Sequence, residues 1–288
     1  MTAGRQPEEE VAALPAAPRY GEPAGAGRTF GTLGDYNWIG LRTLYLKEVR
    51  RFFKVVTQAV LAPVVTTLLF LAVFALALGR SGRTVGDLPF LEFLAPGLIM
   101  MSVVQNAFAN TSSSLIIAKI QGNIVDYLMP PLSPGELLLG LVGGGITRGI
   151  VVGIAVALAM LAFVPLGVHA PLLAIYHLIA ASAMLAALGV LAGLWAEKFD
   201  QVAAITNFIV TPLSFLSGTF YSIEQLPEAA RMLALANPFF YMIDGFRYAL
   251  TGHADGVIWI GVLVLALVNL ALWLVCLHLI RIGYKLKA

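Results

Sequence analysis

The residue with the clearest chemical potential is a cation inside an apolar run. Arg148 interrupts the stretch 138–163, and an arginine at the centre of a membrane helix costs about 2.5 to 3.5 kcal/mol on insertion scales. Such a residue is paired, hydrated, or able to reach the membrane surface along its own stem. Two interpretations are open: Arg148 contacts an anionic group in a polar cavity, or it lies close enough to the cytosolic face to reach water.

Three amides make two other apolar runs more polar. Asn106 and Asn110 lie within 93–117, beside Thr111 and three serines, and Asn207 lies within 202–221. Side chains of this kind form hydrogen bonds between helices in lipid or line a polar path through the membrane. Both roles are open for these amides.

One acidic and one basic residue are spaced to pair. Asp244 and Arg247 are three residues apart, so their side chains meet on one face of a helix. Pairing lowers the cost of placing charges near lipid. We predict a structural pair, with a role in gating as the alternative.

Several classes of chemistry are excluded by what the sequence lacks. The four histidines show no metal-ligand spacing, and the single cysteine allows no disulfide or CxxC motif. No GxxxxGK[ST] phosphate loop occurs, and a net charge of +2 does not suggest nucleic acid binding. The clustered catalytic groups of a membrane-embedded enzyme are also missing. We therefore expect no metal site, no cofactor bound by this chain and no enzymatic activity.

The elements that position these residues are membrane-spanning helices. The chain has 288 residues, of which 59% are hydrophobic, and a mean hydropathy of +0.86, so the fold class is an all-α polytopic membrane protein. A helix needs about 20 apolar residues to cross the hydrocarbon. Six transmembrane helices are predicted, at 57–78, 93–117, 138–163, 172–196, 202–221 and 257–279.

The segments before the first span have a different composition. Residues 1–35 are rich in Ala, Pro and Gly, and we predict a disordered cytosolic tail. Residues 36–56 place Trp38, Leu41, Leu44 or Tyr45, and Phe52 at roughly helical spacing among basic residues. This pattern fits an N-terminal interfacial amphipathic helix, and a basic leader that only fixes topology is equally compatible with it.

Basic residues indicate the orientation of the spans, because they concentrate on the cytoplasmic side. With the N-terminus inside, the inner side holds Arg42, Lys47, Arg50, Arg51, Lys54, Lys119, Lys198, Arg281, Lys285 and Lys287. The outer side then holds Arg80, Arg83, Arg231 and Arg247. Both termini and the loop 119–136 are therefore predicted to be cytosolic.

That loop, KIQGNIVDYLMPPLSPGE, is polar although it lies between two apolar runs. At 100° per residue, Ile120, Ile124, Tyr127 and Leu128 fall on one side of a short amphipathic helix. The opposite, polar side holds Lys119, Gly122, Asn123 and Asp126, and Pro130 and Pro131 end the helix. Periodicity leaves open whether this is a connecting loop or a docking element.

Small residues recur every fourth position in two spans. Gly145, Gly149, Gly153 and Ala157 form one stripe, Gly140 and Gly144 a similar pair, and Gly189 and Gly193 another. Such stripes let helices approach closely in lipid. We expect them to pack within one chain, with packing across a dimer as the alternative.

Two segments carry a resemblance to a known family. FLAPGLIMMSVVQNAFANTSSSLIIAKIQGNIVDYLMPPLSPGELLLG and TPLSFLSGTFYSIEQLPEAARMLALANPFFYMIDGFRYALTG resemble the permease subunit of type-2 ATP-binding-cassette (ABC-2) exporters. The likeness covers about Leu44 to Lys285, so residues 57–284 would form an ABC-2 type transmembrane domain.

The resemblance implies a function and partners. It implies a multi-pass permease of the bacterial inner membrane, working in efflux, with both ends cytosolic and outer-leaflet re-entrant helices between spans five and six. Residues 119–132 would be the cytosolic coupling helix that contacts a separate cassette ATPase. The assembly would hold two copies of each subunit, a permease homodimer and ATP with magnesium on the partner. The transported substrate, whether drug, lipid, glycan or polysaccharide, is not indicated by any residue.

The alternative from another class is a secondary transporter or channel without an ATPase partner. Proteins of that class place ionisable groups at mid-membrane and often contain inverted repeats. Here no carboxylate lies inside a predicted span and no repeat is evident, so the ABC-2 permease is preferred.

Overall fold

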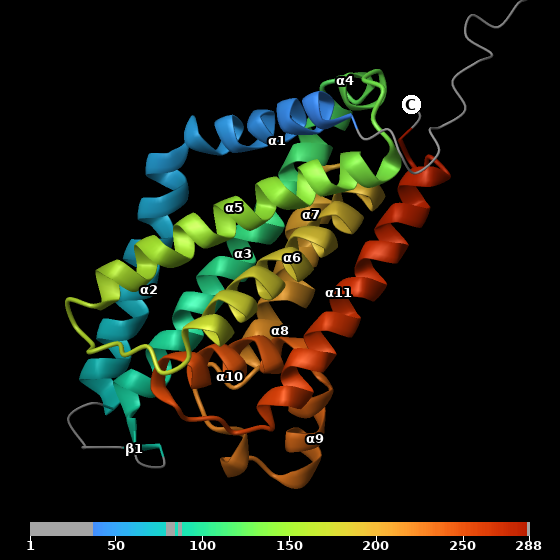
Figure 1. The fold of residues 1–288 in the computed structure, drawn as a ribbon. Helices are drawn as coiled ribbons and strands as arrows, with labels where there is room; N and C mark the ends of the chain where they lie inside the picture. Colours follow the sequence, from blue (N-terminus) through green and yellow to red (C-terminus); the bar gives the residue numbers. More distant parts are fainter. Residues whose placement is uncertain (1–36, 79–83, 86–87, 287–288) are drawn as a thin grey trace, which may run out of the picture. The chain divides into compact units, whose positions relative to one another are not determined.

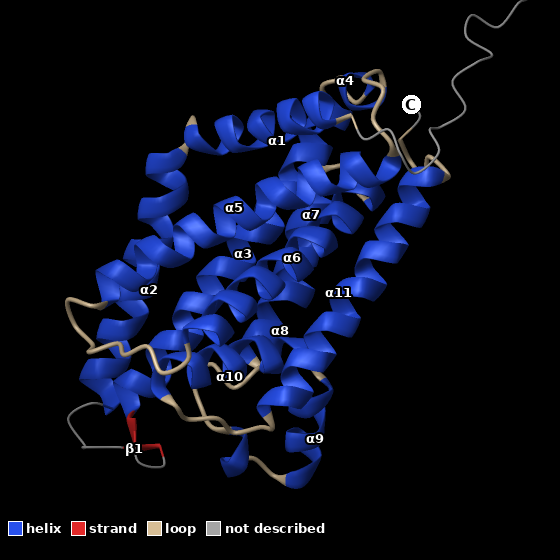
Figure 2. Cartoon of the chain, viewed as in Figure 1, coloured by secondary structure: helices blue, strands red, loops and turns tan. Residues whose placement is uncertain are grey.

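The computed structural model describes residues 37–78, 84–85 and 88–286, and these residues are almost entirely helical (Figures 1 and 2). The predicted tail, 1–35, lies outside the described residues. The long helices are α1 (Trp38–Phe53), α2 (Val56–Leu78), α3 (Phe90–Ile120), α5 (Pro134–Met160), α6 (Pro171–Trp195) and α11 (Ile258–Arg281). The shorter ones are α4 (Val125–Leu128), α7 (Phe199–Ile205), α8 (Thr211–Phe215), α9 (Glu228–Ala236) and α10 (Pro238–Thr251). Two-residue strands β1 (Thr84–Val85) and β2 (Leu88–Pro89) form an antiparallel pair before α3.

Five helices of the described residues are long and apolar enough to cross a membrane. They are Val56–Ala77, Phe90–Ile120, Pro134–Met160, Pro171–Trp195 and Ile258–Arg281. These five correspond to predicted spans one to four and six. The chain is therefore an all-α polytopic membrane protein.

The predicted fifth span is interrupted. α7 continues into a π-helical segment, η2 (Thr206–Val210), and then into α8, which ends at Phe215 rather than near 221. The amide of Thr211 donates to the carbonyl of Thr206, five residues back, and the adjacent Pro212 has no amide hydrogen to restore the α-helical register. The count of six spans thus stays a prediction.

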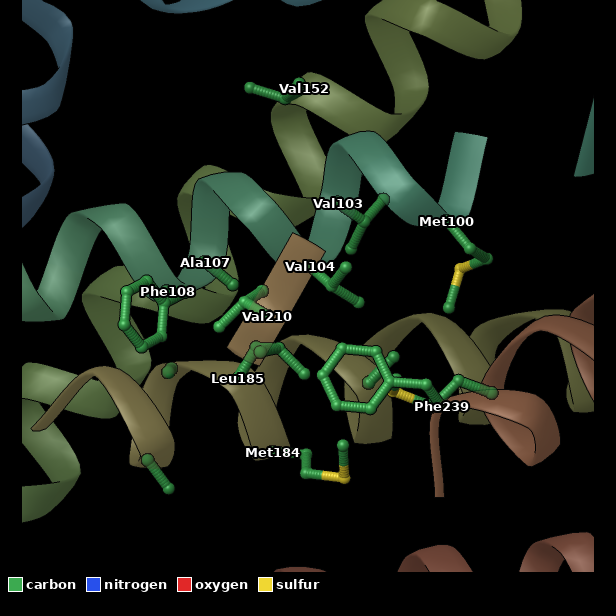
Figure 3. Packing of buried hydrophobic residues seen from close by; sticks show 14 of the residues in the cluster. Met100, Val103, Val104, Ala107, Phe108, Val152, Met184, Leu185, Val210 and Phe239 are labelled. Carbon is green, nitrogen blue, oxygen red and sulfur yellow. The ribbon is translucent and has the colours of Figure 1, made fainter. Parts of the chain in front are cut away.

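The core is organised around α3, the most deeply buried of the long helices. Figure 3 shows Val104, Ala107 and Phe108 of α3 beside Leu185 of α6. Val210 of η2 and Phe239 of α10 belong to the same buried cluster. α3 is therefore the element against which α5, α6 and α10 pack.

Glycines of α5 and α6 allow this close packing. A Cβ on Gly189 would lie 2.5 Å from the carbonyl oxygen of Phe108, and one on Gly149 would lie 2.8 Å from the hydroxyl of Ser182. Both distances are shorter than the non-bonded contacts that Cβ atoms make, so glycine is the residue that fits without a shift of the neighbouring helix. The predicted packing of the small-residue stripes within one chain is confirmed for these positions.

Two ends of the described part can be distinguished (Figure 1). At the α4 end, the ammonium of Lys119 donates to the carbonyls of Leu194 and Ala196, and Lys285 pairs with Glu197 at 2.8 Å. Asn37 lies at the same end, because its side chain donates to the carbonyl of Pro131. At the opposite α9 end lie α9, α10 and the β pair. The start of α1 and the residues after α11 therefore lie at one end.

The segment between α8 and α11 folds as two short helices, as the sequence predicted. A 3₁₀ turn, η3 (Ile223–Gln225), precedes α9, and Asn237 separates α9 from α10 and accepts a hydrogen bond from the amide of Phe239. α10 packs against α3, α6 and α11. Placement of these helices in the outer leaflet stays a prediction.

Candidate coupling site at α1, α3 and α4

The loop predicted to be a coupling helix is bent at a glycine. α3 ends at Ile120, and Gly122 has φ of +72°, a left-handed conformation that glycine adopts without strain. The following helix, α4, has only four residues. The amphipathic helix expected over 119–128 is thus wrong as one continuous element, because the chain turns at Gly122.

The turn changes which side chains face outward. Ile124 and Tyr127 are buried as predicted, but Ile120 and Leu128 are 52% and 44% exposed. Gly122, Asn123 and Asp126 are also exposed. We define the α4 patch as the exposed residues Ile120, Gln121, Gly122, Asn123, Val125, Asp126, Leu128 and Met129.

Lys119 is not part of this patch. Its ammonium group caps the C-terminus of α6 through the carbonyls of Leu194 and Ala196, where a cation is favoured by the helix dipole. The expectation of a solvated Lys119 is therefore corrected: this residue ties α3 to α6.

The two prolines connect the patch to α5. Pro130 is partly buried and Pro131 is exposed. Ser133 then caps α5 in a capping box with Glu136, and the carboxylate of Glu136 also accepts a hydrogen bond from the amide of Asn37. The start of α1 and the start of α5 are thereby joined.

A buried carboxylate joins α1, α3 and α4. Glu48 of α1 is fully buried, and one of its oxygens accepts hydrogen bonds from Ser114 of α3 at 2.7 Å and Tyr127 of α4 at 3.0 Å. Its other oxygen pairs with Arg51 at 3.0 Å. A buried charge needs this number of partners to offset its desolvation, so the three helices are held together at one point.

Arg51 extends the network along α3. Its guanidinium donates to the backbone carbonyl of Asn110 at 2.6 Å and to its side-chain oxygen at 3.2 Å, and to Ser113 at 3.1 Å. Lys47 lies 3.8 Å from the ring centroid of Tyr127, within cation–π distance. Burial, and then the charge of Glu48, raises the pKa of Tyr127, so its hydroxyl stays protonated and donates.

Space for α1 is provided by glycines of α5. A Cβ on Gly140 would lie 2.6 Å from Leu44, and one on Gly144 would lie 2.6 Å from the Cβ of Glu48. The pair noted in the sequence therefore packs against α1.

The sequence analysis missed the role of Glu48, although a signal was present. Glu48 is four residues from both Leu44 and Phe52 and therefore lies on the apolar face of α1. A carboxylate on the buried face of an amphipathic helix requires a partner, and that reasoning would have indicated a buried network.

Arg148 reaches across to α3 instead of toward the helix end. Its Nε and Nη2 donate to Oδ1 of Asn106 at 3.2 and 3.1 Å, and its guanidinium lies 5.7 Å from the ring centroid of Phe52. It forms no ion pair with any residue in the described ranges. Since it lies 14 residues after the start of α5, it is about 21 Å along that helix. Both interpretations of Arg148, contact with an anionic group in a polar cavity and a reach to water along its own stem, stay predictions.

The other predicted polar residues lie apart from the α4 end. Asn207 of η2 is exposed. Arg247 is fully buried, donates to the carbonyls of Phe93 at 3.1 Å and Gly218 at 2.7 Å, and lies 3.8 Å from Asp244. The carboxylate of Asp244 also accepts hydrogen bonds from the backbone amides of Asp255 and Gly256. Burial raises the pKa of Asp244, while these amides and Arg247 oppose the rise.

Comparison with known proteins decides the family. The model of the ABC-2 type transporter family matches residues 40–251. The chain belongs to the ABC-2 type transporter family. It is 38% identical over 253 residues to the inner membrane transport permease YadH of Escherichia coli K12, covering 87% of this chain and 98% of that protein. This ABC-2 permease is therefore an inner membrane multi-pass transport protein.

More distant relatives are nodulation proteins. Nodulation protein J of Rhizobium leguminosarum bv. viciae is 25% identical over 244 residues, covering 82% of this chain and 91% of that protein. Nodulation protein J of Rhizobium meliloti is 23% identical over 223 residues, covering 75% of this chain and 82% of that protein.

Glu48 and Tyr127 should be energetically coupled. Tyr127→Phe removes hydrogen bonds to a charged group, which costs about 1.5 to 3 kcal/mol, and Glu48→Gln leaves Arg51 without its ion pair. The double variant should cost less than the sum of the two, with an interaction energy of about 0.5 to 3 kcal/mol. The free energy of unfolding is measured for the solubilised wild type, the two single variants and the double variant.

Tyr176→Phe is the matched control, because its hydroxyl donates to Val262 on the other side of α6. Its effect should add to that of Glu48→Gln. Additive effects of Glu48→Gln and Tyr127→Phe would contradict the network.

Proposed function

We propose that this permease is the membrane subunit of an ATP-driven export system and that a separate cassette ATPase docks on the α4 patch. The observation that carries the proposal is the α4 patch itself. Val125, Leu128 and Met129 are apolar and exposed although they lie outside the five long apolar helices, and Ile120 is exposed at the last residue of α3. An exposed apolar patch with polar neighbours is typical of a protein–protein interface. The chain has no phosphate loop of its own, so ATP and magnesium would bind on the partner.

The Glu48 network suggests how a movement of the patch would reach the membrane. Tyr127 projects inward from the same short helix that exposes Asp126. A displacement of α4 by the ATPase therefore acts on Glu48, and through it on α1 and α3. α1 directly precedes the span α2, and α3 is itself a span. The ATPase would therefore switch the permease between inward-open and outward-open states.

The α4 end is proposed to be cytosolic. Arg42, Lys47, Arg50, Arg51 and Lys54 belong to α1 or follow it directly, and Lys119, Lys198, Arg281 and Lys285 lie in the last residues of α3 and α11 or just after α6 and α11. Basic residues accumulate on the cytoplasmic face. Both termini would then be cytosolic, α1 would lie in the interface, and α9 and α10 would occupy the outer leaflet.

A second copy of the permease is proposed to cover the exposed polar positions of α2. Gln58 and Thr66 of α2 are exposed, although this helix is apolar. Polar side chains within a span face a partner or a polar cavity in preference to lipid. The run α7–η2–α8 would be the fifth of six spans in each copy of such a homodimer.

Arg148 is proposed to line the translocation path together with Asn106, Asn110 and Asn207. Arg148 of α5 and Arg51 of α1 donate hydrogen bonds to Asn106 and Asn110, which lie one turn apart on α3. Glu48 forms an ion pair with Arg51 but not with Arg148. A partly exposed cation without an ion pair favours a passage for anionic groups.

The function is tested by isolating the permease from its native host. We expect a cassette ATPase to accompany it, vanadate-sensitive ATP hydrolysis by the complex, and a mass in native mass spectrometry of two permeases with two ATPases. Transport of solute by the permease without ATP, or the absence of any co-purifying ATPase, would favour a secondary transporter or channel.

Charge reversal in the α4 patch should uncouple the ATPase. Asp126→Lys changes an exposed charge in the proposed interface, so the affinity for the ATPase should fall at least about tenfold while membrane insertion is unchanged. Asp200→Lys is the control, because Asp200 is exposed in the first turn of α7 and lies outside the patch. Equal ATPase binding by both variants would contradict the assignment of the α4 patch as the docking site.

Path residues should be reached by water-soluble reagents. With Cys276→Ser as background, Arg148→Cys and Asn207→Cys should react in native membranes with a charged, membrane-impermeant thiol reagent. Leu158→Cys should not react, because Leu158 is 64% exposed on the apolar outside of α5. If the first two stay as unreactive as Leu158→Cys with and without ATP, the path lies elsewhere.

A further inference from the structure

A groove lies between α5, α6 and α11. Its volume is about 460 Å³, and all three helices contribute to its lining; α6 lies between the other two in Figure 1. Ala180, Ala183 and Ala187 of α6 form its base, since they are small and at least partly buried, whereas Leu139 of α5 and Leu270 of α11 are exposed beside it. The groove is therefore a site for a guest molecule rather than a gap filled by the permease itself.

The hydroxyl of Tyr176 and the amide of Asn269, which both line the groove, already have partners. The hydroxyl of Tyr176 donates to the carbonyl of Val262 at 2.7 Å, and the amide of Asn269 donates to the carbonyls of Ala180 at 3.1 Å and Leu265 at 2.9 Å. The other lining side chains are apolar except for the indole N–H of Trp273. An apolar occupant is therefore preferred, because a polar one would lose its hydrogen bonds to water.

A cation follows the groove on the same side of α11. Arg281 comes eleven residues after Leu270, which is about three turns, so both side chains leave the helix in nearly the same direction. Arg281 is exposed, and it makes no hydrogen bond or ion pair with the residues that the structure describes. It is therefore available to an anionic group outside the bundle.

The spacing between this cation and the groove fits a lipid. Trp273 and Ala266 of the lining come 8 and 15 residues before Arg281, or about 12 and 22 Å along the helix. Half of the hydrocarbon thickness is about 15 Å. A headgroup at Arg281, about 20 Å from the midplane of the bilayer, thus places the terminal half of an acyl chain in the groove.

We propose that the groove binds one acyl chain of an anionic phospholipid and that Arg281 binds its phosphate group. The bound lipid fills the space between α5 and α11, which touch each other far less than each touches α6. Basic residues at a membrane surface attract anionic lipids. This site is independent of the ATPase and of the translocation path.

Native mass spectrometry of the intact permease tests the proposal with a matched pair of variants. Ala266 and Ala271 are both exposed alanines of α11, but only Ala266 lines the groove. After transfer from an equal mixture of phosphatidylglycerol and phosphatidylcholine into mild detergent, wild type and Ala271→Trp should retain a phospholipid. Ala266→Trp fills the groove, so the fraction of permease with a bound phospholipid should fall at least about tenfold.

The headgroup is tested separately. Arg281→Gln should still retain lipid but lose its preference for phosphatidylglycerol over phosphatidylcholine by about fivefold. Equal retention by Ala266→Trp and Ala271→Trp would overturn the site. A change in the number of permease copies with Ala266→Trp would overturn it too, because a second copy would then occupy the groove.

Discussion

The arrangement at the α4 end depends on one carboxylate withdrawn from water. Glu48 is fully buried and is satisfied only when Ser114, Tyr127 and Arg51 converge on it from α3, α4 and α1. Moving α3 or α4 alone removes a hydrogen bond to the buried carboxylate, which costs about 1.5 to 3 kcal/mol. α1, α3 and the short α4 therefore behave as one unit, and the outward α4 patch is rigidly attached to a span.

Close packing in the bundle connects this unit to the other helices. α3 lies at the centre, and glycines at positions such as 144, 149 and 189 leave no room for an added methyl group. Interfaces this tight shift between discrete arrangements rather than deform continuously. We propose that a displacement at Tyr127 is transmitted along α3 toward Asn106 and Arg148. At the α9 end, Arg247 fixes α10 to the start of α3 through the carbonyl of Phe93.

Hydropathy and spacing were sufficient for five of the six predicted spans and for α9 and α10, because each depends on a periodic pattern. The family was indicated by the resemblance of two extended segments. Hydropathy and spacing were insufficient where one residue overrides the pattern. Gly122 breaks the predicted coupling helix and so exposes Ile120 and Leu128. Lys119 was assigned to a wet face but caps α6, a contact between residues 75 positions apart that no local pattern contains. Glu48 lies among basic residues and looks solvated until its place on the apolar face is considered.

Hydrogen exchange of the permease in lipid nanodiscs tests the central claim most directly. Glu48→Gln should make the amides of residues 121–132 and of α1 exchange about tenfold faster, because the charge that holds them together is gone. The amides of α9 and α10 should be unaffected, since they lie at the other end. Unchanged exchange at 121–132 in Glu48→Gln would contradict the account, because α4 would then be held in place without the buried carboxylate.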